Sequence, residues 1–365
     1  MNPLPPSPGP PGAAPSPRRV VVIGGSAGAL GALLEIARHL PGDFPGAVLV
    51  AVHVSPDYPS RLPQLLNDAG PLEARHAEDG EPLRAGCIRV APPDHHLLIA
   101  GKRLRLSRGP RENRARPSID VLFRSAASAR GPDALGVLLS GMLDDGASGL
   151  WTIKRLGGQV TVQHPEEAPY PSMPLSAVQQ VEVDDILPAG AIGPRMLAWA
   201  RQPGRGEDPP AMTDHDRQRL DIELGVAAED NAFEGGVLNL GPLVPFTCPE
   251  CHGVMVRIQE GAGLRFRCHT GHAFSPAALL SELRESVEAA LWTSVRALDE
   301  NVMLLDHLRK HFDEADQPAA AEVFGHEAAE VKENNRALRE LALRVGRRGA
   351  EDLAQLAPQD GDAPD

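Results

Sequence analysis

Residues 20–28 read Val-Val-Val-Ile-Gly-Gly-Ser-Ala-Gly, and this stretch decides the fold. The apolar, largely β-branched run is typical of a buried strand, and a helical pattern follows over residues 30–40. Gly24 to Gly28 match the spacing G-x-S-x-G, which places a nucleophilic serine on a sharp turn between a strand and a helix. Ser26 is therefore a candidate nucleophile, because the free N–H groups of the helix point at the same place.

The same turn has two other interpretations. A glycine-rich turn after a strand can bind the phosphates of a dinucleotide. The spacing G-x-G-x-x-G is not met, however, and the second strand ends in His53 rather than in an acidic residue. The turn can also be an ordinary one with an exposed serine, so the rest of the chain has to decide.

Composition narrows the class of protein. A chain of 365 residues with 42% hydrophobic content has room for two or three domains with real cores. The net charge of −13 argues against nucleic acid as the main partner. No apolar run approaches the ~20 residues that span a bilayer, which predicts no membrane insertion. Residues 1–17 are proline-rich and predict a disordered leader, and the four cysteines are typical of a reduced, cytoplasmic protein.

Strand-like and helix-like segments alternate along the first 200 residues. Strands are predicted at 47–54, 87–90, 134–140, 158–163 and 181–187, and helices at 61–66, 119–129 and 147–156. Ser118 is the predicted N-cap of the helix over 119–129, and Gly101-Lys102 predicts a hairpin between residues 96–100 and 103–106. The predicted fold class is α/β, Rossmann-like, with a mostly parallel sheet and helices on both faces.

Polar side chains follow three of the predicted strands. His53 follows the second strand, and Asp145 lies in the loop after the strand over 134–140. Together with Ser26 they provide a nucleophile, a base and an acid at one sheet edge. A standard α/β-hydrolase would need a histidine after the acid, and His164 follows too closely. The simpler interpretation is that His53 is structural and that Asp145 only caps the helix that starts at 147.

Six segments in order resemble one known family, and they cover roughly residues 18–200. Their sequences are Val22-Ile23-Gly24-Gly25-Ser26-Ala27-Gly28, Val52-His53, Ala91-Pro92-Pro93-Asp94-His95-His96-Leu97, Arg116-Pro117-Ser118-Ile119-Asp120, Ser140-Gly141-Met142-Leu143-Asp144-Asp145-Gly146-Ala147 and Ser172-Met173-Pro174. This part of the chain resembles the catalytic domain of CheB-type protein-glutamate methylesterases.

The resemblance implies an activity and the residues that perform it. The triad would be Ser26, His53 and Asp145, with backbone N–H groups of Ala27 and Met142 as oxyanion donors. The implied reaction is hydrolysis of glutamate methyl esters on the cytoplasmic helices of chemoreceptors through an acyl-enzyme, together with deamidation of glutamines. No cofactor is implied for catalysis.

The chain also departs from the family pattern. Ala27 stands where the family commonly has threonine, and Leu143 replaces the second glycine of the usual Gly-Met-Gly-x-Asp-Gly loop. Family members of two-component chemotaxis carry an N-terminal receiver domain, and a leader of residues 1–17 is too short for one. We therefore expect no control by aspartyl phosphorylation within the chain.

A second predicted site follows the linker at 201–245. Cys248, Cys251 and Cys268 flank two alternating segments with a glycine-rich turn between them, which predicts a zinc ribbon over 246–275. The fourth ligand is His272 or His269, of which His272 leaves the wider spacer, and His252 is a weaker option. A closed set of four ligands predicts structural Zn²⁺. The alternative is a set of free or redox-active cysteines.

Residues 276–349 predict two long amphipathic helices in an antiparallel hairpin. Their apolar stripe can pack on the ribbon within the chain, on a second copy in a homodimer, or on a partner protein. The sequence alone does not distinguish these three possibilities. Residues 350–365 are predicted as a disordered tail.

The leading hypothesis is a cytoplasmic methylesterase acting on methylated receptors in chemosensory adaptation. One alternative is a regulatory binding protein with an idle esterase domain, which would release no methanol. Another is a small-molecule carboxylesterase, which would cleave generic esters in preference to receptor esters.

Overall fold

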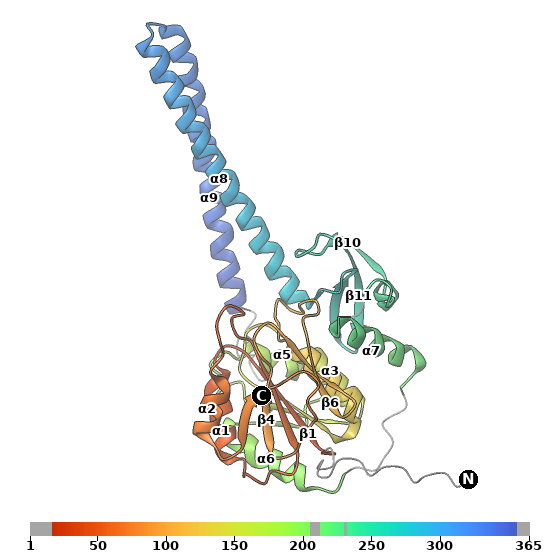
Figure 1. Cartoon of the computed structure of the whole chain (residues 1–365). Helices are drawn as coiled ribbons and strands as arrows, with labels where there is room; N and C mark the ends of the chain where they lie inside the picture. Colours follow the sequence, from red (N-terminus) through yellow and green to blue (C-terminus); the bar gives the residue numbers. More distant parts are fainter. Residues whose placement is uncertain (1–16, 205–211, 230–231, 356–365) are drawn as a thin grey trace, which may run out of the picture. The chain divides into compact units, whose positions relative to one another are not determined.

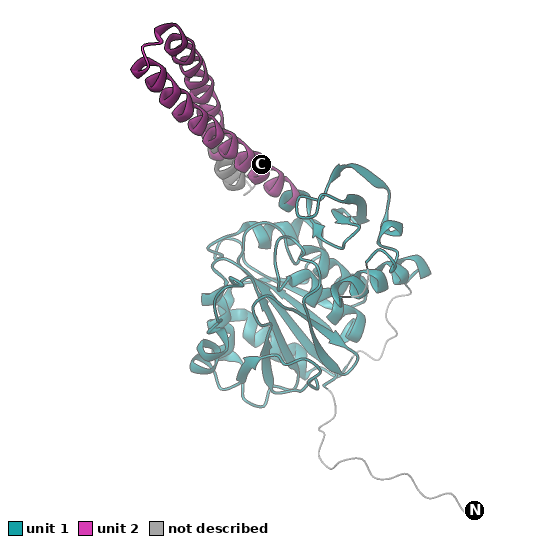
Figure 2. Ribbon diagram, turned by 45° about the horizontal axis from the view of Figure 1, so that its top comes forward, with its two compact units in different colours: residues 1–278 teal, residues 279–365 magenta. Residues whose placement is uncertain are grey.

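The computed structural model of the chain describes residues 17–204, 212–229 and 232–355. The predicted leader, apart from its last residue, and the predicted tail from residue 356 lie outside the described residues. The chain divides into two compact units, Met1–Ala278 and Leu279–Asp365 (Figure 2), which are described one at a time.

A seven-stranded parallel sheet lies at the centre of the first unit (Figure 1). In spatial order its described strands are β3 (Glu73–His76), β4 (Cys87–Val90), β2 (Ala47–Val52), β1 (Val20–Gly25), β7 (Ala134–Leu138), β8 (Gln159–Gln163) and β9 (Asp185–Leu187). After β1 the chain adds strands on one side of it, beginning with β2, and later adds β7, β8 and β9 on its other side. The direction in which strands are added therefore reverses between β1 and β7. Ligands in such sheets gather where the order reverses, at the carboxyl ends of the strands.

Helices cover both faces of the sheet, and the residues of β1 show why. Val20 and Val22 belong to one core, whereas Val21 and Ile23 belong to the other, because successive side chains of a strand point to opposite faces. The first core is closed by α3 (Ile119–Arg130), α4 (Ala147–Arg155) and α5 (Ser172–Gln180). The second is closed by α1 (Ala29–His39), α2 (Leu62–Ala69) and α6 (Ala189–Arg201). The predicted fold class is confirmed.

Two strands differ from the prediction. Strand β3 reads Glu-Ala-Arg-His and was not predicted, because an edge strand needs no apolar run. Strand β9 covers only Asp185–Leu187 of the segment predicted at 181–187. The hairpin predicted around Gly101-Lys102 is present as β5 (His96–Ala100) and β6 (Arg103–Ser107).

A smaller antiparallel sheet follows in the same unit, after α7 (Asp214–Ala227) and the short helix η2 (Val237–Leu240). Its strands, in order, are β10 (Leu243–Thr247), β11 (Val254–Glu260), β12 (Gly263–Cys268) and β13 (Ala273–Phe274). We refer to β10–β13 as the ribbon. Strands β11 and β12 form the hairpin that the alternating sequence predicts.

A buried ionic cluster joins the ribbon and α7 to the parallel sheet's helices. Arg267 binds Glu112 (2.6 Å) and Glu223 (2.7 Å), and Arg124 binds the same two carboxylates. Arg265 of the ribbon binds Glu223 at 3.0 Å. All of these side chains are buried, so each charge depends on its partners, and removal of one would leave an uncompensated charge.

The second unit is a helical hairpin of α8 (Pro276–Glu314), from Leu279 onward, and α9 (Pro318–Gln355). Near the turn Phe312 stacks on Phe324, and further along Lys332 binds Asp306 at 2.9 Å. The predicted antiparallel pairing is therefore present. Among the described residues, none of the helices combines the length and the apolar composition that crossing a membrane requires.

Candidate active site

Ser26 lies directly after β1, where the strand order of the sheet reverses. Its backbone N–H donates to Ser140 O at the end of β7 (2.9 Å). Gly28 then adopts φ +76°, a conformation that favours glycine, and α1 begins at Ala29. A Cβ on Gly141 would come within 3.0 Å of Ser26 Cβ, so glycine at 141 allows the loop after β7 to approach the serine.

His53 lies directly after the neighbouring strand β2, and its backbone N–H donates to Gly25 O (3.2 Å). Its ring atom Nε2 bonds Asp145 Oδ2 at 2.7 Å. Ser26, His53 and Asp145 all line one pocket of about 390 Å³. No hydrogen bond joins Ser26 Oγ to the His53 ring in the described part of the chain, a separation that is common before a substrate binds. The ring atom left for a serine proton is Nδ1.

Asp145 is buried and accepts hydrogen bonds from several elements. Besides His53, its donors are the N–H groups of Ile119 (2.8 Å) and Asp120 (3.3 Å), the hydroxyl of Ser118 and the amide of Asn113 (both 3.1 Å). Burial alone would raise the pKa of Asp145, but the hydrogen bond and charge of His53, followed by the Ile119 and Asn113 donors, hold that pKa well below its usual value. Asp145 is therefore a carboxylate, as an acid that orients a histidine must be.

The helix that Asp145 caps is not the expected one. The simpler interpretation of the sequence was that Asp145 only caps the helix starting at 147, but the N-cap of α4 is Gly146 and no side chain caps it locally. Asp145 instead caps α3, and Asp120 of α3 accepts the N–H groups of Gly146 (3.0 Å) and Gly149 (2.7 Å) at the start of α4. The two helices thus exchange their caps. Burial and the charge of Asp145 raise the pKa of Asp120.

The prediction that Ser118 is the N-cap residue of the helix is confirmed, although its side chain bonds another partner. Ser118 is the N-cap residue of α3, but its hydroxyl donates to Asp145 and accepts no backbone bond. Its backbone N–H donates to His96 Nδ1 (3.2 Å), and His96 Nε2 faces Pro110 O (3.0 Å). Because Nδ1 accepts the Ser118 N–H, it carries no proton, and His96 is a neutral imidazole in this hydrogen-bond pattern. Burial lowers the pKa of His96 to about 4.

The folded protein should lose stability in acid through His96. Its folded pKa lies below the ordinary value of about 6.5, so the unfolded chain binds the extra proton and stability falls as the pH drops from about 6.5 toward 4. Between pH 6.5 and 4.5 the wild type should lose about 2 to 3 kcal/mol of unfolding free energy more than His96→Gln. Urea unfolding of both proteins across this range measures the difference. Parallel pH profiles for the two would contradict it.

The rim of the pocket carries three arginines in a chain of net charge −13: Arg111, Arg114 and Arg116. Arg116 is fixed by Asp94, which accepts from its Nε (2.9 Å) and Nη2 (2.7 Å). Arg111 and Arg114 are exposed. The rim thus favours an acidic ligand.

Among the described residues, the backbone N–H groups of Ala27 and Met142 are without an acceptor, and so are those of Gly28 and Leu143. Ala27 directly follows Ser26 in the chain, and Met142 lines the pocket. Leu143, which follows, has φ 62°, in the region that favours glycine. The loop thus keeps a glycine-like conformation at this position without a glycine.

Four side chains of the ribbon lie close enough together to hold a metal ion: Cys248, Cys251, Cys268 and His272. Their ligand atoms all lie within 4.8 Å of one another. Cys251 Sγ lies 3.6 Å from Cys268 Sγ, and His272 Nδ1 lies 3.6 and 3.7 Å from Cys268 Sγ and Cys248 Sγ. Tetrahedral Zn²⁺ with bonds of about 2.0 to 2.3 Å needs ligand separations of this size. The group is compatible with zinc, and His269 and His252 are not part of it.

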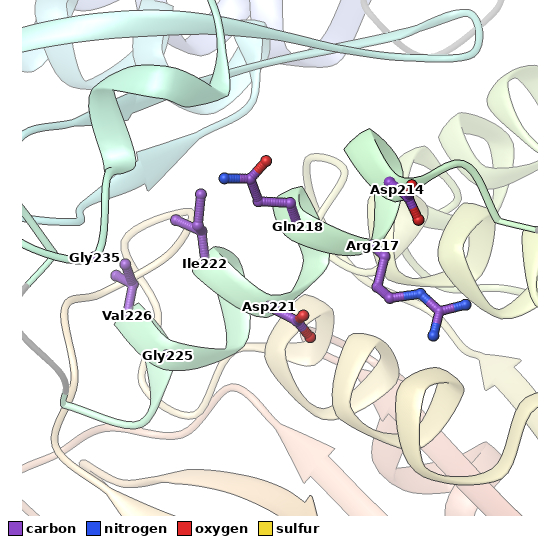
Figure 3. Close-up of a pocket in the computed structure, with 8 residues that line it drawn as sticks. All are labelled: Asp214, Arg217, Gln218, Asp221, Ile222, Gly225, Val226 and Gly235. Atoms are coloured by element: carbon purple, nitrogen blue, oxygen red, sulfur yellow. The ribbon is translucent and has the colours of Figure 1, made fainter.

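A larger cavity of about 490 Å³ lies along α7 (Figure 3). Its lining includes the exposed Asp214, Arg217 and Asp221, but no serine, cysteine or histidine among the described residues. Its described lining therefore lacks a serine or cysteine nucleophile paired with a histidine, and the pocket with Ser26 is the candidate active site.

Comparison with known proteins shows which family the first part of the chain is similar to. Residues 21–196 match the family model of the CheB methylesterase. The chain carries a CheB methylesterase domain. The three candidate catalytic residues of the pocket, Ser26, His53 and Asp145, all lie in this domain.

Curated relatives of the CheB methylesterase domain are named protein-glutamate methylesterase/protein-glutamine glutaminase. One from Rhodopseudomonas palustris strain BisB18 is 36% identical over 197 residues, covering 52% of this chain and 54% of that protein. One from Burkholderia pseudomallei strain 1710b is 38% identical over 187 residues, covering 50% and 51%. The chain thus spans about half the length of these relatives. The solved catalytic domain of Thermotoga maritima CheB methylesterase is 30% identical, with a TM-score of 0.48, over 49% of this chain and 97% of that domain.

Sequence patterns alone did not indicate Asn113 or Asp120 as parts of the site. Both residues are buried and polar. The side-chain amide of Asn113 and the backbone N–H of Asp120 each donate to the Asp145 carboxylate. Asp120 lies inside a segment that resembles the family, and its position in the first helical turn was the available signal. Asn113 lies in a polar loop without any motif.

Proposed function

We propose that the CheB methylesterase domain hydrolyses methyl esters of glutamate side chains on chemoreceptors. The observation that carries this proposal is the His53–Asp145 hydrogen bond beside Ser26 in the pocket of a CheB methylesterase domain. The names of the relatives, protein-glutamate methylesterase/protein-glutamine glutaminase, support the substrate class. The arginine rim is compatible with an acidic protein segment as the substrate.

In the proposed reaction Ser26 Oγ attacks the ester carbonyl, and His53 Nδ1 takes the serine proton. Asp145 holds Nε2 and stabilises the charged ring. The backbone N–H groups of Ala27 and Met142 receive the oxyanion. The C–OCH₃ bond then breaks, methanol leaves with the proton from His53, and water hydrolyses the acyl-enzyme to glutamate. The same steps on a glutamine side chain would release ammonia, which is the glutaminase activity in the relatives' names.

We further propose that Cys248, Cys251, Cys268 and His272 hold a structural Zn²⁺. All four tetrahedral positions are taken by protein ligands, so the metal would stabilise the ribbon and offer no position to a substrate. Glu250 lies 3.3 Å from His272 Nε2 and would fix the ring from outside the ligand set.

Methanol release separates the proposed function from its alternatives. Purified full-length protein is incubated with membranes whose receptors carry labelled methyl groups, and in parallel with p-nitrophenyl acetate. We expect labelled methanol from the receptors at a higher kcat/KM than for the generic ester. Cleavage of the generic ester alone would identify a small-molecule esterase. No product from either substrate would indicate an idle domain.

A further inference from the structure

The last strand of the ribbon forms backbone hydrogen bonds with a loop of the active site. Asn113 N–H donates to Ala273 O (2.8 Å), and Ala273 N–H donates to Arg111 O (3.2 Å). Ala273 and Asn113 are both buried. The segment Arg111–Asn113, which lines the pocket with Ser26, is therefore held by β13.

The side chain of Asn113 continues this connection into the site. Its Oδ1 accepts the N–H of Ser275, two residues beyond Ala273 (2.8 Å). Its Nδ2 donates to Asp145 Oδ1 (3.1 Å) and to Asp120 Oδ2 (3.3 Å). The amide oxygen thus faces a donor and the amide nitrogen faces two carboxylates, which fixes the orientation of the amide group.

The Cys248–Cys251–Cys268–His272 group lies at the other end of the connection. Cys268 ends β12, and His272 directly precedes Ala273. Between them Cys268 N–H donates to His272 O (2.9 Å), and His272 N–H donates to Cys268 Sγ (3.2 Å). Two of the four ligands therefore bracket the turn that leads into β13, so a bound metal would fix where β13 starts.

We propose that Asn113 is a positioning residue through which the Cys248–Cys251–Cys268–His272 group supports Asp145, so that the ribbon is a working part of the esterase site. The proposal rests on the proposed function of that site. A fixed β13 holds Asn113, Asn113 holds Asp145, and Asp145 orients His53. Loss of the metal should lower kcat, because Asn113 bonds the Asp145 carboxylate.

The first test uses the wild-type full-length protein with bound Zn²⁺ and after removal of the metal by a chelator. Metal content is measured, together with amide hydrogen exchange and methanol release. We expect one Zn²⁺ per chain. Its removal should speed exchange at the Asn113 and Ala273 amides and lower kcat by about 10- to 100-fold, the effect of losing a hydrogen bond to a charged group. Added Zn²⁺ should restore both. Unchanged exchange and unchanged kcat after metal loss would overturn the proposal.

The second test asks whether the effect passes through Asn113. Asn113→Ala should lower kcat of the metal-bound protein by about 10- to 100-fold, and chelation should then lower it by less than about threefold more, because coupled sites are not additive. The control is Asn67→Ala, whose amide bonds both backbone groups of Ala74 outside the pocket. Its kcat should match the wild type. A full chelation effect in Asn113→Ala would overturn the proposal.

The two levels of inference fail in different ways. If the metal-bound wild type releases no methanol from receptors, the proposed function fails, and hydrogen exchange still reports whether the ribbon holds Asn113. If methanol is released at the same rate with and without the metal, only the positioning role fails. Should Asn113→Ala not fold, the chelation experiment on the wild type decides alone.

Discussion

Ser26→Ala is expected to lower kcat for methanol release by about 10³- to 10⁶-fold, the range found when a triad serine is removed. The variant keeps the backbone N–H bond from residue 26 to Ser140 O and loses only the hydroxyl. The fold should therefore persist, with an unfolding free energy within about 1 kcal/mol of the wild type, as for a truncation that leaves no buried group unpaired. Methanol release from labelled receptors and urea unfolding measure the two quantities.

A matched control is Ser176→Ala. Ser176 lies on α5, where its hydroxyl accepts from Gln180 (2.7 Å), and it is not part of the pocket lining. Its kcat should equal that of the wild type. If Ser26→Ala kept a kcat within tenfold of the wild type, Ser26 would not be the nucleophile.

Asp145→Asn has the second large expected effect, a loss of about 10³- to 10⁴-fold in kcat, as for the acid of other serine triads. A new amide nitrogen in the place of Oδ2 would face the His53 ring and the Ile119 N–H. In the place of Oδ1 it would face Asn113 Nδ2 and the Asp120 N–H, so one donor would always meet another donor. The histidine would lose its orientation and the start of α3 would lose a charged cap. Lower stability should accompany the loss of rate.

Asp144→Asn provides the adjacent control. Burial raises the pKa of Asp144 to about 6, and its Oδ1 accepts a hydrogen bond from the hydroxyl of Ser275, which an asparagine oxygen can also accept. Methanol release should stay within tenfold of the wild type. If the two asparagine variants lost equal activity, Asp145 would have no special role and the order Ser–His–Asp would lose its meaning.

The apolar periodicity of the sequence was sufficient to predict the parallel sheet. Strand β1 and its neighbours are continuous apolar runs because both of their faces are covered, and this pattern is visible in any single chain. Strand β3 was missed because it lies at the sheet edge with charged side chains. Its partner Cys87–Val90 alone defines its register.

The order of polar residues at strand ends predicted which side chains share the pocket. Ser26, His53 and Asp145 line it together, and their catalytic roles stay predictions until the variants are made. The docking of the ribbon could not be predicted. It depends on pairs such as Glu112–Arg267 and Asn113–Ser275, whose members lie more than 150 residues apart and form no local pattern.

The exchange of caps between Asp145 and Asp120 has a consequence for comparing members of the family. Because the carboxylate at position 145 closes the first turn of α3, it stabilises the fold whether or not the domain is active. A descendant that had lost its esterase activity is expected to keep this aspartate, whereas the residues at positions 26 and 53 could be substituted without loss of stability. Genome surveys for inactive members should therefore score the serine and the histidine, and should count the aspartate only as a marker of the fold.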